Sequence, residues 1–593
     1  WLKELWLTSQ TAPPARAKIS SMPPVAPRAA ASDDGDDDAE GWANAAFEAA
    51  FERPFAKDTL VFASISVSED RVAFRYEHVD ANGVALGALT PALRMAGLGG
   101  MLGPPGSEAR EAMDQAILGL GMAVFCYVWM GFLTPRMLIR ASVGTRQSAA
   151  LSQDQLDFWK EVILQSLREH FFVNGVRSYD SESGRGLTDL VLENEGAPRC
   201  SGSEAVRPPP IAKADVGPRR VLVPMGAGKD STVAWELLSQ AAAGNNSLER
   251  RWFFLEGTER EFGRCWRYSA LAEASGVAAS DVLVAEFVWP TADFERRRNP
   301  ALSMVGHPWA AVVCFASAVV ALAHGYDYVA VGNERSAGLG NGVEWEGVEV
   351  NHQWDKSFAF ERQAQLYLER HCLGRLSYFS VLTPLWDVQV ALLFGHLCPK
   401  YLPLIISCNQ PQGPCASRWC GECAKCAFVA AVLGAFFPVA AVCGVFGDNP
   451  FESGALAGHL DLLAGLGPDA ASDDVDPTVI VSAALPARAR EHCKVLTQPW
   501  KPLECVGGAD ETRLALGLVE QRYARERRPL PKLFTPARRA AMYRGTACAT
   551  PAGSLDHSLL HDWGEEHLVP PWLEGAVRDC LRRALEDEFG TTV

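Results

Sequence analysis

The sequence has little positive charge for its size, with 55 lysines and arginines against 71 acidic residues and a formal net charge of −16. Proteins that bind nucleic acids usually carry a basic stripe or patch, so we expect no nucleic-acid partner. This balance still leaves room for a local basic pocket that holds a nucleotide. Hydrophobic residues make up 48% and charged residues 21% of the 593 residues, which is typical of a globular protein.

Long uninterrupted apolar runs are also scarce. Residues 116–133 contain no charged side chain and are just long enough to cross a bilayer. Residues 308–323 are short for a membrane span, and residues 427–447 are broken by Pro438. All three runs are rich in alanine, glycine or cysteine, so we predict buried core helices and expect no membrane partner.

The first residue is Trp1 rather than methionine, so we expect a fragment or a processed chain. Residues 8–31 are rich in serine, alanine and proline and contain no acidic residue, and an acidic run follows at 32–40. We predict that residues 1–42 are disordered. The composition of 8–31 is also typical of a targeting peptide. The sequence suits a bacterial cytoplasmic location and also a plastid location.

Twelve of the sixteen cysteines stand at no metal-like spacing, which is typical of free thiols in a reducing compartment. The other four form a C-x11-C-x2-C-x2-C pattern. Four thiolates complete a tetrahedral zinc site and leave no open position, so we predict a structural Zn²⁺ knuckle. An iron–sulfur cluster is the alternative, and Cys415 is a candidate substitute ligand. The predicted ligands are Cys408, Cys420, Cys423 and Cys426.

Residues 43–200 form a first region with strand and helix patterns. Two β-rich runs at 61–67 and 72–79 are separated by a short polar turn, which predicts a hairpin. Residues 155–172 carry apolar side chains at three- and four-residue spacing, which predicts a helix. We therefore predict a smaller α+β N-terminal domain.

The pattern changes after a proline-rich segment at 201–218, which we interpret as a linker. From 219 to 455, short apolar strands alternate with helical segments. This alternation predicts an α/β domain with a doubly wound parallel sheet. Residues 456–593 follow no repeat, and we expect mixed helix and loop there.

A glycine-rich turn, MGAGKDST at 225–232, follows the first strand of the α/β region. It is not a Walker A loop, because Asp230 stands where serine or threonine would follow the GK pair. Small residues let backbone N–H groups approach phosphate, and the next helix points its positive dipole end at the same place. We therefore predict an ATP-binding loop, with an ordinary strand–helix turn as the alternative. The predicted ATP-binding residues are Gly226, Gly228, Lys229, Asp230 and Ser231.

Asn333 and Glu334 follow a later strand of the same region. Open α/β sheets bind ligands at the carboxyl ends of their strands. We therefore predict that these two residues hold Mg²⁺ or the ribose of ATP, with an ordinary polar loop as the alternative.

The glycine-rich loop resembles the S-G-G-x-D-S loop of the PP-loop ATP pyrophosphatases, which have a HUP-like fold. That resemblance implies binding of ATP and cleavage between its α and β phosphates, with transfer of AMP to the substrate. Met225 and Ala227 replace the usual serine and second glycine. We expect the alanine to cost only some backbone freedom.

A PP-loop followed by a cysteine knuckle also occurs in deazaguanine synthases that form a nitrile. Six segments together are more similar to the MurL-type UDP-N-acetylmuramoyl-L-alanyl-L-glutamate epimerases, and this resemblance covers most of 115–545. The segments are the loop at 224–231, VGNERSA (331–337), VNHQWDKSFAFE (350–361), LTPLWDVQ (382–389), the cysteine-rich stretch 407–428 and KPLECVGGADETRLAL (501–516).

The resemblance implies an ATP-dependent inversion of the terminal L-Glu of UDP-MurNAc-L-Ala-L-Glu to D-Glu, a step in peptidoglycan precursor synthesis. It proceeds through an acyl adenylate and forms AMP and pyrophosphate. Adenylation makes chemical sense because it removes the negative charge that keeps the neighbouring C–H bond weakly acidic. The alternatives are another AMP-forming enzyme, for nitrile formation, thiolation or amidation, and an inactive nucleotide-binding module.

Three residues of these segments are candidates for the acid–base chemistry. His352 titrates near neutral pH, Lys356 is placed to face a carboxylate or the α-phosphate, and Cys505 suits inversion as a thiol acid or base. Structural roles are the alternatives for each. We expect Asn351 and Gln353, in the same segment as His352, to bind substrate.

Overall fold

The structure is a computed structural model of the chain. The predicted tail at 1–42 lies outside the described residues, as does the linker at 201–218 apart from Pro218. The residues that the structure describes are 57–143, 151–176, 190–195, 218–244, 247–257, 262, 264–465, 494–495, 501–542 and 555–590.

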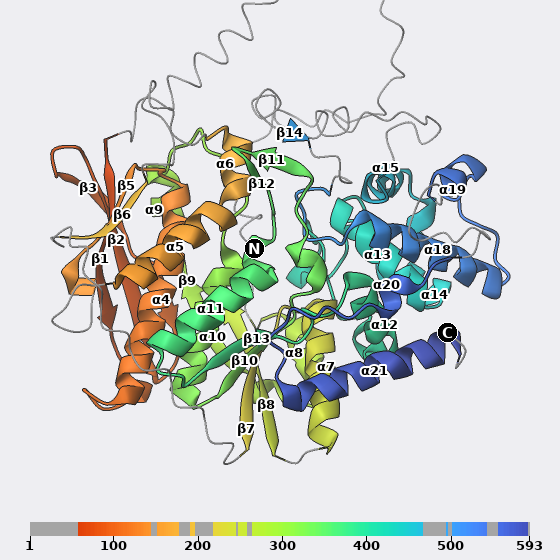
Figure 1. Cartoon of the computed structure of the whole chain (residues 1–593), viewed down its shortest axis with the longest axis horizontal. Helices are drawn as coiled ribbons and strands as arrows, with labels where there is room; N and C mark the ends of the chain where they lie inside the picture. Colours follow the sequence, from red (N-terminus) through yellow and green to blue (C-terminus); the bar gives the residue numbers. More distant parts are fainter. Residues whose placement is uncertain are drawn as a thin grey trace, which may run out of the picture.

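An eleven-stranded sheet runs through the molecule (Figure 1). Its larger parallel part has the order β13-β10-β7-β8-β9, and β1, β5 and β6 also pair in parallel. The chain first extends the sheet on one side of β7 and then returns to add β10 and β13 on the other side. Open α/β sheets bind ligands at such a reversal, beyond the carboxyl ends of the strands. These strands are β7 (Arg219–Pro224), β8 (Leu248–Glu256), β9 (Leu283–Val288), β10 (Tyr328–Val331) and β13 (Ser377–Ser380).

The N-terminal strands extend the same sheet. The first two form the predicted hairpin, and β4 pairs antiparallel with β9. Through this pairing, the regions predicted at 43–200 and 219–455 share one sheet. Strand β4 also covers what would otherwise be an open edge at β9. The strands are β1 (Thr59–Val67), β2 (Arg71–Val79), β3 (Ala85–Leu89), β4 (Ala92–Arg94), β5 (Arg136–Ile139) and β6 (Val191–Asn194).

Helices cover both faces of the parallel part. Leu222 of β7 packs into one core, whereas its neighbours Val221 and Val223 pack into the other. This alternation follows from the two-residue period of a strand. The predicted α/β class with a large, mostly parallel sheet is confirmed. The first core contains α4 (Glu108–Met130), α10 (Trp309–His324) and α11 (Phe358–His371), and the second contains α7 (Lys229–Gly244), α8 (Trp266–Ala274), α12 (Asp387–Leu397) and α13 (Ala424–Phe436).

The apolar run at 116–133 lies mostly in α4, which is long and apolar enough to cross a membrane. In this structure 89% of its most apolar window is buried, and α4 packs against α10. A Cβ atom on Gly119 would lie 2.4 Å from the ring of Phe315. The run is therefore a tightly packed core helix here.

The remaining described elements surround these layers. The single helix predicted at 155–172 is two helices, α5 and α6, which are separated at Leu167. The later helices pack mainly on the second core, with α18 against α13 and α21 against α7. The elements are α3 (Leu98–Met101), α5 (Gln153–Ser166), α6 (Arg168–Asn174), α14 (Val439–Phe446), α15 (Gly454–Leu463), α18 (Ala509–Arg525), α19 (Pro536–Met542), α20 (Ser558–His561), α21 (Pro571–Phe589), and a small sheet of β11 (Val343–Trp345), β12 (Val348–Glu349) and β14 (Lys494–Val495).

Candidate active site

The glycine-rich loop connects β7 to α7 at the reversal of the strand order. Helix α7 begins at Lys229, directly after Gly228. Its N-terminal N–H groups therefore face the space beyond the carboxyl ends of the parallel strands. Ala227 has a φ of 56°, a left-handed conformation that costs a non-glycine residue about 1–2 kcal/mol. The sequence led us to expect that alanine would cost only some backbone freedom here. The positive φ shows that it also costs conformational strain.

Neighbouring segments hold this loop in place. The carbonyl of Ala227 accepts hydrogen bonds from the backbone N–H of Ile406 at 3.2 Å and from the guanidinium of Arg267 at 3.4 Å. The hydroxyl of Ser231 donates to the carbonyl of Gly228 at 3.4 Å. Ile406 lies two residues before Cys408, so the chain that enters the cysteine knuckle also fixes the loop.

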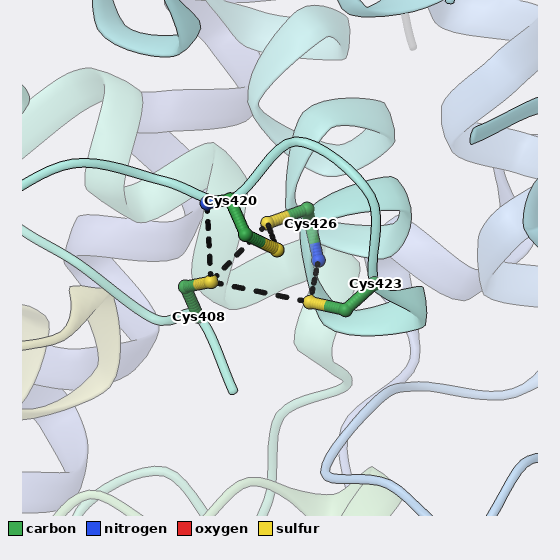
Figure 2. A group of neighbouring side chains, drawn as sticks. All are labelled: Cys408, Cys420, Cys423 and Cys426. Carbon is green, nitrogen blue, oxygen red and sulfur yellow. Dashed lines mark hydrogen bonds between the residues drawn. The ribbon is translucent and has the colours of Figure 1, made fainter. Parts of the chain in front are cut away.

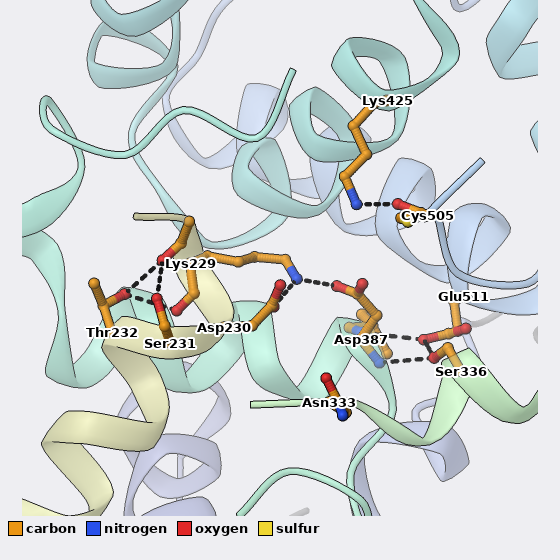
Figure 3. Close-up of polar contacts among 12 residues, drawn as sticks. Lys229, Asp230, Ser231, Thr232, Asn333, Ser336, Asp387, Lys425, Cys505 and Glu511 are labelled. Atoms are coloured by element: carbon orange, nitrogen blue, oxygen red, sulfur yellow. Dashed lines mark hydrogen bonds and ion pairs between the residues drawn. The ribbon is translucent and has the colours of Figure 1, made fainter. Parts of the chain in front are cut away.

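Lys229 is buried between two carboxylates (Figure 3). Its Nζ atom forms ion pairs with Asp230 and, at 2.6 Å, with Asp387. Burial alone would lower the pKa of Lys229, but the two carboxylates raise it above its ordinary value. Burial in turn raises the pKa of Asp387, against the opposing effect of Lys229. The lysine is therefore a fixed positive charge at the start of α7.

Asp230, Glu334 and Asp387 bring carboxylate oxygens within 4.8 Å of one another. Asp387 is the first residue of α12, and its role was not predicted, although the segment 382–389 contributes to the family resemblance. Carboxylate oxygens are the ligands that Mg²⁺ prefers. The donor set therefore fits one divalent cation next to the glycine-rich loop.

Glu334 reaches this group because the chain after β10 passes close to the loop. A Cβ atom on Gly332 would lie 2.8 Å from the carbonyl oxygen of Asp230, so only glycine fits there. The next residue is held by β13. The backbone N–H of Asn333 donates to Ser380 Oγ at 2.8 Å, and its carbonyl accepts from the same hydroxyl at 2.7 Å.

The three predicted acid–base residues form a second group. Lys356 Nζ donates to Cys505 Sγ at 3.3 Å, and the imidazole of His352 also contacts this thiol. Burial would raise the pKa of Cys505, but Lys356, His352 and Lys425 together lower it well below its ordinary value. The structure thus brings the three residues together and favours a thiolate.

Glu169, on α6, belongs to this group and was missed in the sequence. Its Oε2 lies 2.5 Å from Nδ1 of His352. Although burial opposes the change, Glu169 and then Cys505 raise the pKa of His352 to about 10. A Cβ atom on Gly306 would lie 2.7 Å from the Cβ of Glu169, so a glycine turn closes over the pair. No spacing in the sequence relates residue 169 to residue 352.

Cys505 and Lys425 lie near the group around Lys229 (Figure 3). Lys425, at the start of α13, donates to the backbone carbonyl of Cys505. Lys425 and Lys356 both act to lower the pKa of Asp230, and Glu334 acts to raise the pKa of Lys356. The glycine-rich loop and the thiol are therefore electrostatically coupled neighbours.

The predicted substrate-binding amides are used within the protein. Asn351 donates to the carbonyl of Ala337 at 3.0 Å and accepts from the backbone N–H of Gln353 at 2.8 Å. Gln353 is 1% exposed, and its side-chain amide oxygen Oε1 accepts from Lys501 Nζ at 3.2 Å. These contacts shape the loop that carries His352, and a role of the two residues in binding substrate stays a prediction.

The four predicted zinc ligands converge (Figure 2). Their sulfur atoms lie within 4.8 Å of one another, with Cys408 3.5 Å and Cys420 3.6 Å from Cys426. A zinc ion with Zn–S bonds of about 2.3 Å has sulfur–sulfur distances of about 3.8 Å. Backbone N–H groups of Cys420 and Cys426 also donate to the sulfurs of Cys408 and Cys423. The donor set fits zinc, and Cys415 lies outside it, beside Cys265.

Comparison with known proteins identifies the same family twice. The family model described as the MurL N-terminal domain matches residues 294–381, and the one described as the MurL C-terminal domain matches residues 404–474. The first match spans the segment with Glu334, His352 and Lys356. The second includes the whole cysteine knuckle. No solved structure matches the chain.

Curated relatives carry one name, UDP-N-acetyl-alpha-D-muramoyl-L-alanyl-L-glutamate epimerase. The protein of Xanthomonas oryzae pv. oryzae is 32% identical over 310 residues, which cover 51% of this chain and 57% of the relative. A Micromonospora protein is 27% identical over 381 residues, covering 62% and 70% of the two chains. The Salinispora tropica protein is 30% identical over 322 residues, covering 52% and 58%. The chain is thus related to the MurL-type epimerases, as its motifs predicted.

Proposed function

We propose that this chain is an ATP-dependent epimerase that inverts the terminal L-Glu of UDP-MurNAc-L-Ala-L-Glu to D-Glu through an acyl adenylate. The names of its relatives support this substrate and this reaction. The observation that carries the proposal is the position of the Cys505 thiol, which is held by two cations beside the phosphate loop. An enzyme that only adenylates its substrate has no need of such a base.

The phosphate loop suits the adenylation step. The N–H groups at the start of α7 and the ammonium of Lys229 would bind the phosphates of ATP. Asp230, Glu334 and Asp387 would hold Mg²⁺, which shields phosphate charge during attack on the α-phosphorus. Pyrophosphate would then leave, and AMP would remain on the glutamate carboxylate.

The thiol group suits the inversion that follows. The α-proton of a free carboxylate is weakly acidic because its removal places a second negative charge beside the first. Adenylation neutralises the carboxylate, and a buried base can then take the proton. Water finally releases AMP from the inverted product. We propose that the cysteine knuckle holds a structural zinc ion that orders the start of α13, and hence Lys425.

Incubation of the purified chain with UDP-MurNAc-L-Ala-L-Glu, ATP and Mg²⁺ tests the proposal. We expect AMP, pyrophosphate and D-Glu in equal amounts, and none of them when the dipeptide substrate is replaced by UDP-MurNAc-L-Ala, which lacks the terminal glutamate. Chiral analysis of the hydrolysed product measures the inversion. Pyrophosphate without D-Glu would instead identify another AMP-forming enzyme and would overturn the proposal.

A further inference from the structure

The thiol of Cys505 is surrounded by groups from four separate segments. Lys356 Nζ donates to its sulfur at 3.3 Å. The imidazole of His352 also contacts the sulfur. Glu169 Oε2 lies 2.5 Å from Nδ1 of that imidazole. The charged and titratable groups around the thiol are His352, Asp355 and Lys356 on one loop, Lys425 on α13 and Lys501 on its own segment, with Glu169 on α6 behind His352.

The short distance between Lys356 and Cys505 limits what this group can do. Two groups that act on opposite faces of one carbon atom must each approach it to about 3–3.5 Å, so they stand about 6–7 Å apart. A separation of 3.3 Å leaves no room for a carbon atom between them. Lys356 and Cys505 therefore lie on the same face of any substrate carbon and act as one unit.

We propose that Cys505 is the base that removes the α-proton of the terminal glutamate, and that Glu169 is a positioning residue that acts on Cys505 through His352. This assignment rests on the proposed function and deepens it. Glu169 keeps the imidazole protonated and oriented, and the imidazolium and Lys356 together keep the sulfur negatively charged. The predicted acid–base residues then have different roles, with one base and two supporting cations.

The proton-transfer step balances without any further reagent. The thiolate sulfur forms an S–H bond with the α-hydrogen, and the electron pair of the C–H bond moves into the bond to the activated carbonyl. A group outside this cluster, or water, returns a proton to the opposite face. The thiol then loses its proton to solvent, so that Cys505 is again a thiolate when the next substrate binds.

Two half-reactions separate this assignment from the proposed function. Exchange of labelled pyrophosphate into ATP, with the dipeptide substrate present, reports adenylation. Deuterium uptake at the α-carbon of glutamate reports proton removal. In Cys505→Ala and Cys505→Ser we expect pyrophosphate exchange within about threefold of wild type, and deuterium uptake lower by about 10² to 10⁴. Cys443→Ser, which changes a thiol on α14, serves as the matched control and keeps both rates.

The outcomes are distinguishable. Deuterium uptake at the wild-type rate in both Cys505 variants would overturn the assignment and leave the proposed function standing. Equal loss of both half-reactions would also overturn it, because Cys505 would then support adenylation or the fold. Failure of the wild-type chain to exchange pyrophosphate with this substrate would overturn the proposed function, and this assignment with it.

Glu169→Gln tests the positioning role through a pH profile. Without the carboxylate, His352 loses its proton closer to neutral pH, so the thiolate loses a neighbouring positive charge and the pKa of Cys505 rises. We expect deuterium uptake about tenfold lower at pH 7 and restored at higher pH, with pyrophosphate exchange unchanged. Asp58→Asn, which alters a separate histidine–carboxylate pair with His78 at 2.7 Å, is the control. A loss that is uniform across pH would overturn the positioning role.

Discussion

Lys229 and Asp230 are adjacent in the loop, yet their replacement has different consequences. Lys229 is 2% exposed and pairs with two carboxylates. Removing a buried charge leaves its partners uncompensated, which costs about 3–5 kcal/mol. Asp230 is instead one of three carboxylates in its group, so its neutralisation leaves Lys229 paired with Asp387.

We therefore predict that Asp230→Asn folds normally and abolishes pyrophosphate release, because it removes a candidate Mg²⁺ ligand. Lys229→Met should abolish release and also lower the free energy of unfolding by about 3–5 kcal/mol. Urea unfolding followed by circular dichroism measures the stability, and a coupled phosphate assay measures the release. Wild-type release by a folded Asp230→Asn protein would contradict the role of the loop.

Ala227 offers a test of strain in the same loop. Its left-handed backbone costs alanine about 1–2 kcal/mol of stability. Glycine avoids this cost, but it lowers the free energy of unfolding by about 0.4–1 kcal/mol because the unfolded chain becomes more flexible. We predict that Ala227→Gly raises the free energy of unfolding by up to about 1 kcal/mol. The same substitution in helix α7, Ala242→Gly, should lower it by about 1 kcal/mol. A loss of stability at position 227 as large as that at 242 would contradict the strain.

At the scale of residues, candidate residues could be singled out from the sequence where they are adjacent in the chain. The loop from Gly226 to Ser231 is contiguous, so it could be singled out as a candidate from the order of residues alone. Glu169 and Asp387 were missed because folding alone brings them to His352 and Lys229. Cys505 was given a thiol role from its residue type, but its lowered pKa depends on cations from two other segments, the loop with His352 and Lys356 and the start of α13 with Lys425.

At the scale of elements, the cysteine knuckle connects the fold to the site. Cys423 is the N-terminal cap of α13, and Lys425 lies in the first turn of that helix. The chain that leads to Cys408 bonds to the carbonyl of Ala227 through Ile406. A metal at the four sulfurs would therefore fix both the glycine-rich loop and Lys425, which contacts the backbone of Cys505.

We predict that the purified chain contains about one equivalent of zinc and shows no iron–sulfur absorption, since four thiolates fit one tetrahedral ion. Cys423→Ser should lose the metal and melt at lower temperature, because binding of structural zinc contributes directly to folding. Metal analysis and thermal unfolding measure both effects, with Cys443→Ser as the thiol control. A metal-free wild-type chain with unchanged stability would contradict this prediction.

The alternation of strands and helices from residue 219 onward was enough to predict the parallel sheet, because each strand and helix has a local hydrophobic period. Its continuation into the N-terminal strands was not predictable in this way. That join rests on the pairing of β4 with β9, whose partner residues, Ala92 and Val288 among them, are far apart in the chain. No local pattern specifies which edge strand another segment will cover.

At the scale of the whole molecule, negative charge prevails while cations gather at the site. The net charge is −16, yet Lys229, Lys356 and Lys425 all contribute to the field at Asp230. Fixed cations of this kind can contact a substrate that carries phosphates and carboxylates. This distribution of charge agrees with a nucleotide-linked dipeptide better than with a nucleic acid.

Turnover in D₂O is the measurement that tests the central claim most directly. The account predicts deuterium at the α-carbon of the product glutamate only when ATP and Mg²⁺ are present, with AMP and pyrophosphate formed alongside. The label requires ATP because the unactivated carboxylate leaves the C–H bond too weakly acidic for a thiolate to break. Pyrophosphate formed without deuterium in the glutamate, or deuterium incorporated without ATP, would contradict the account.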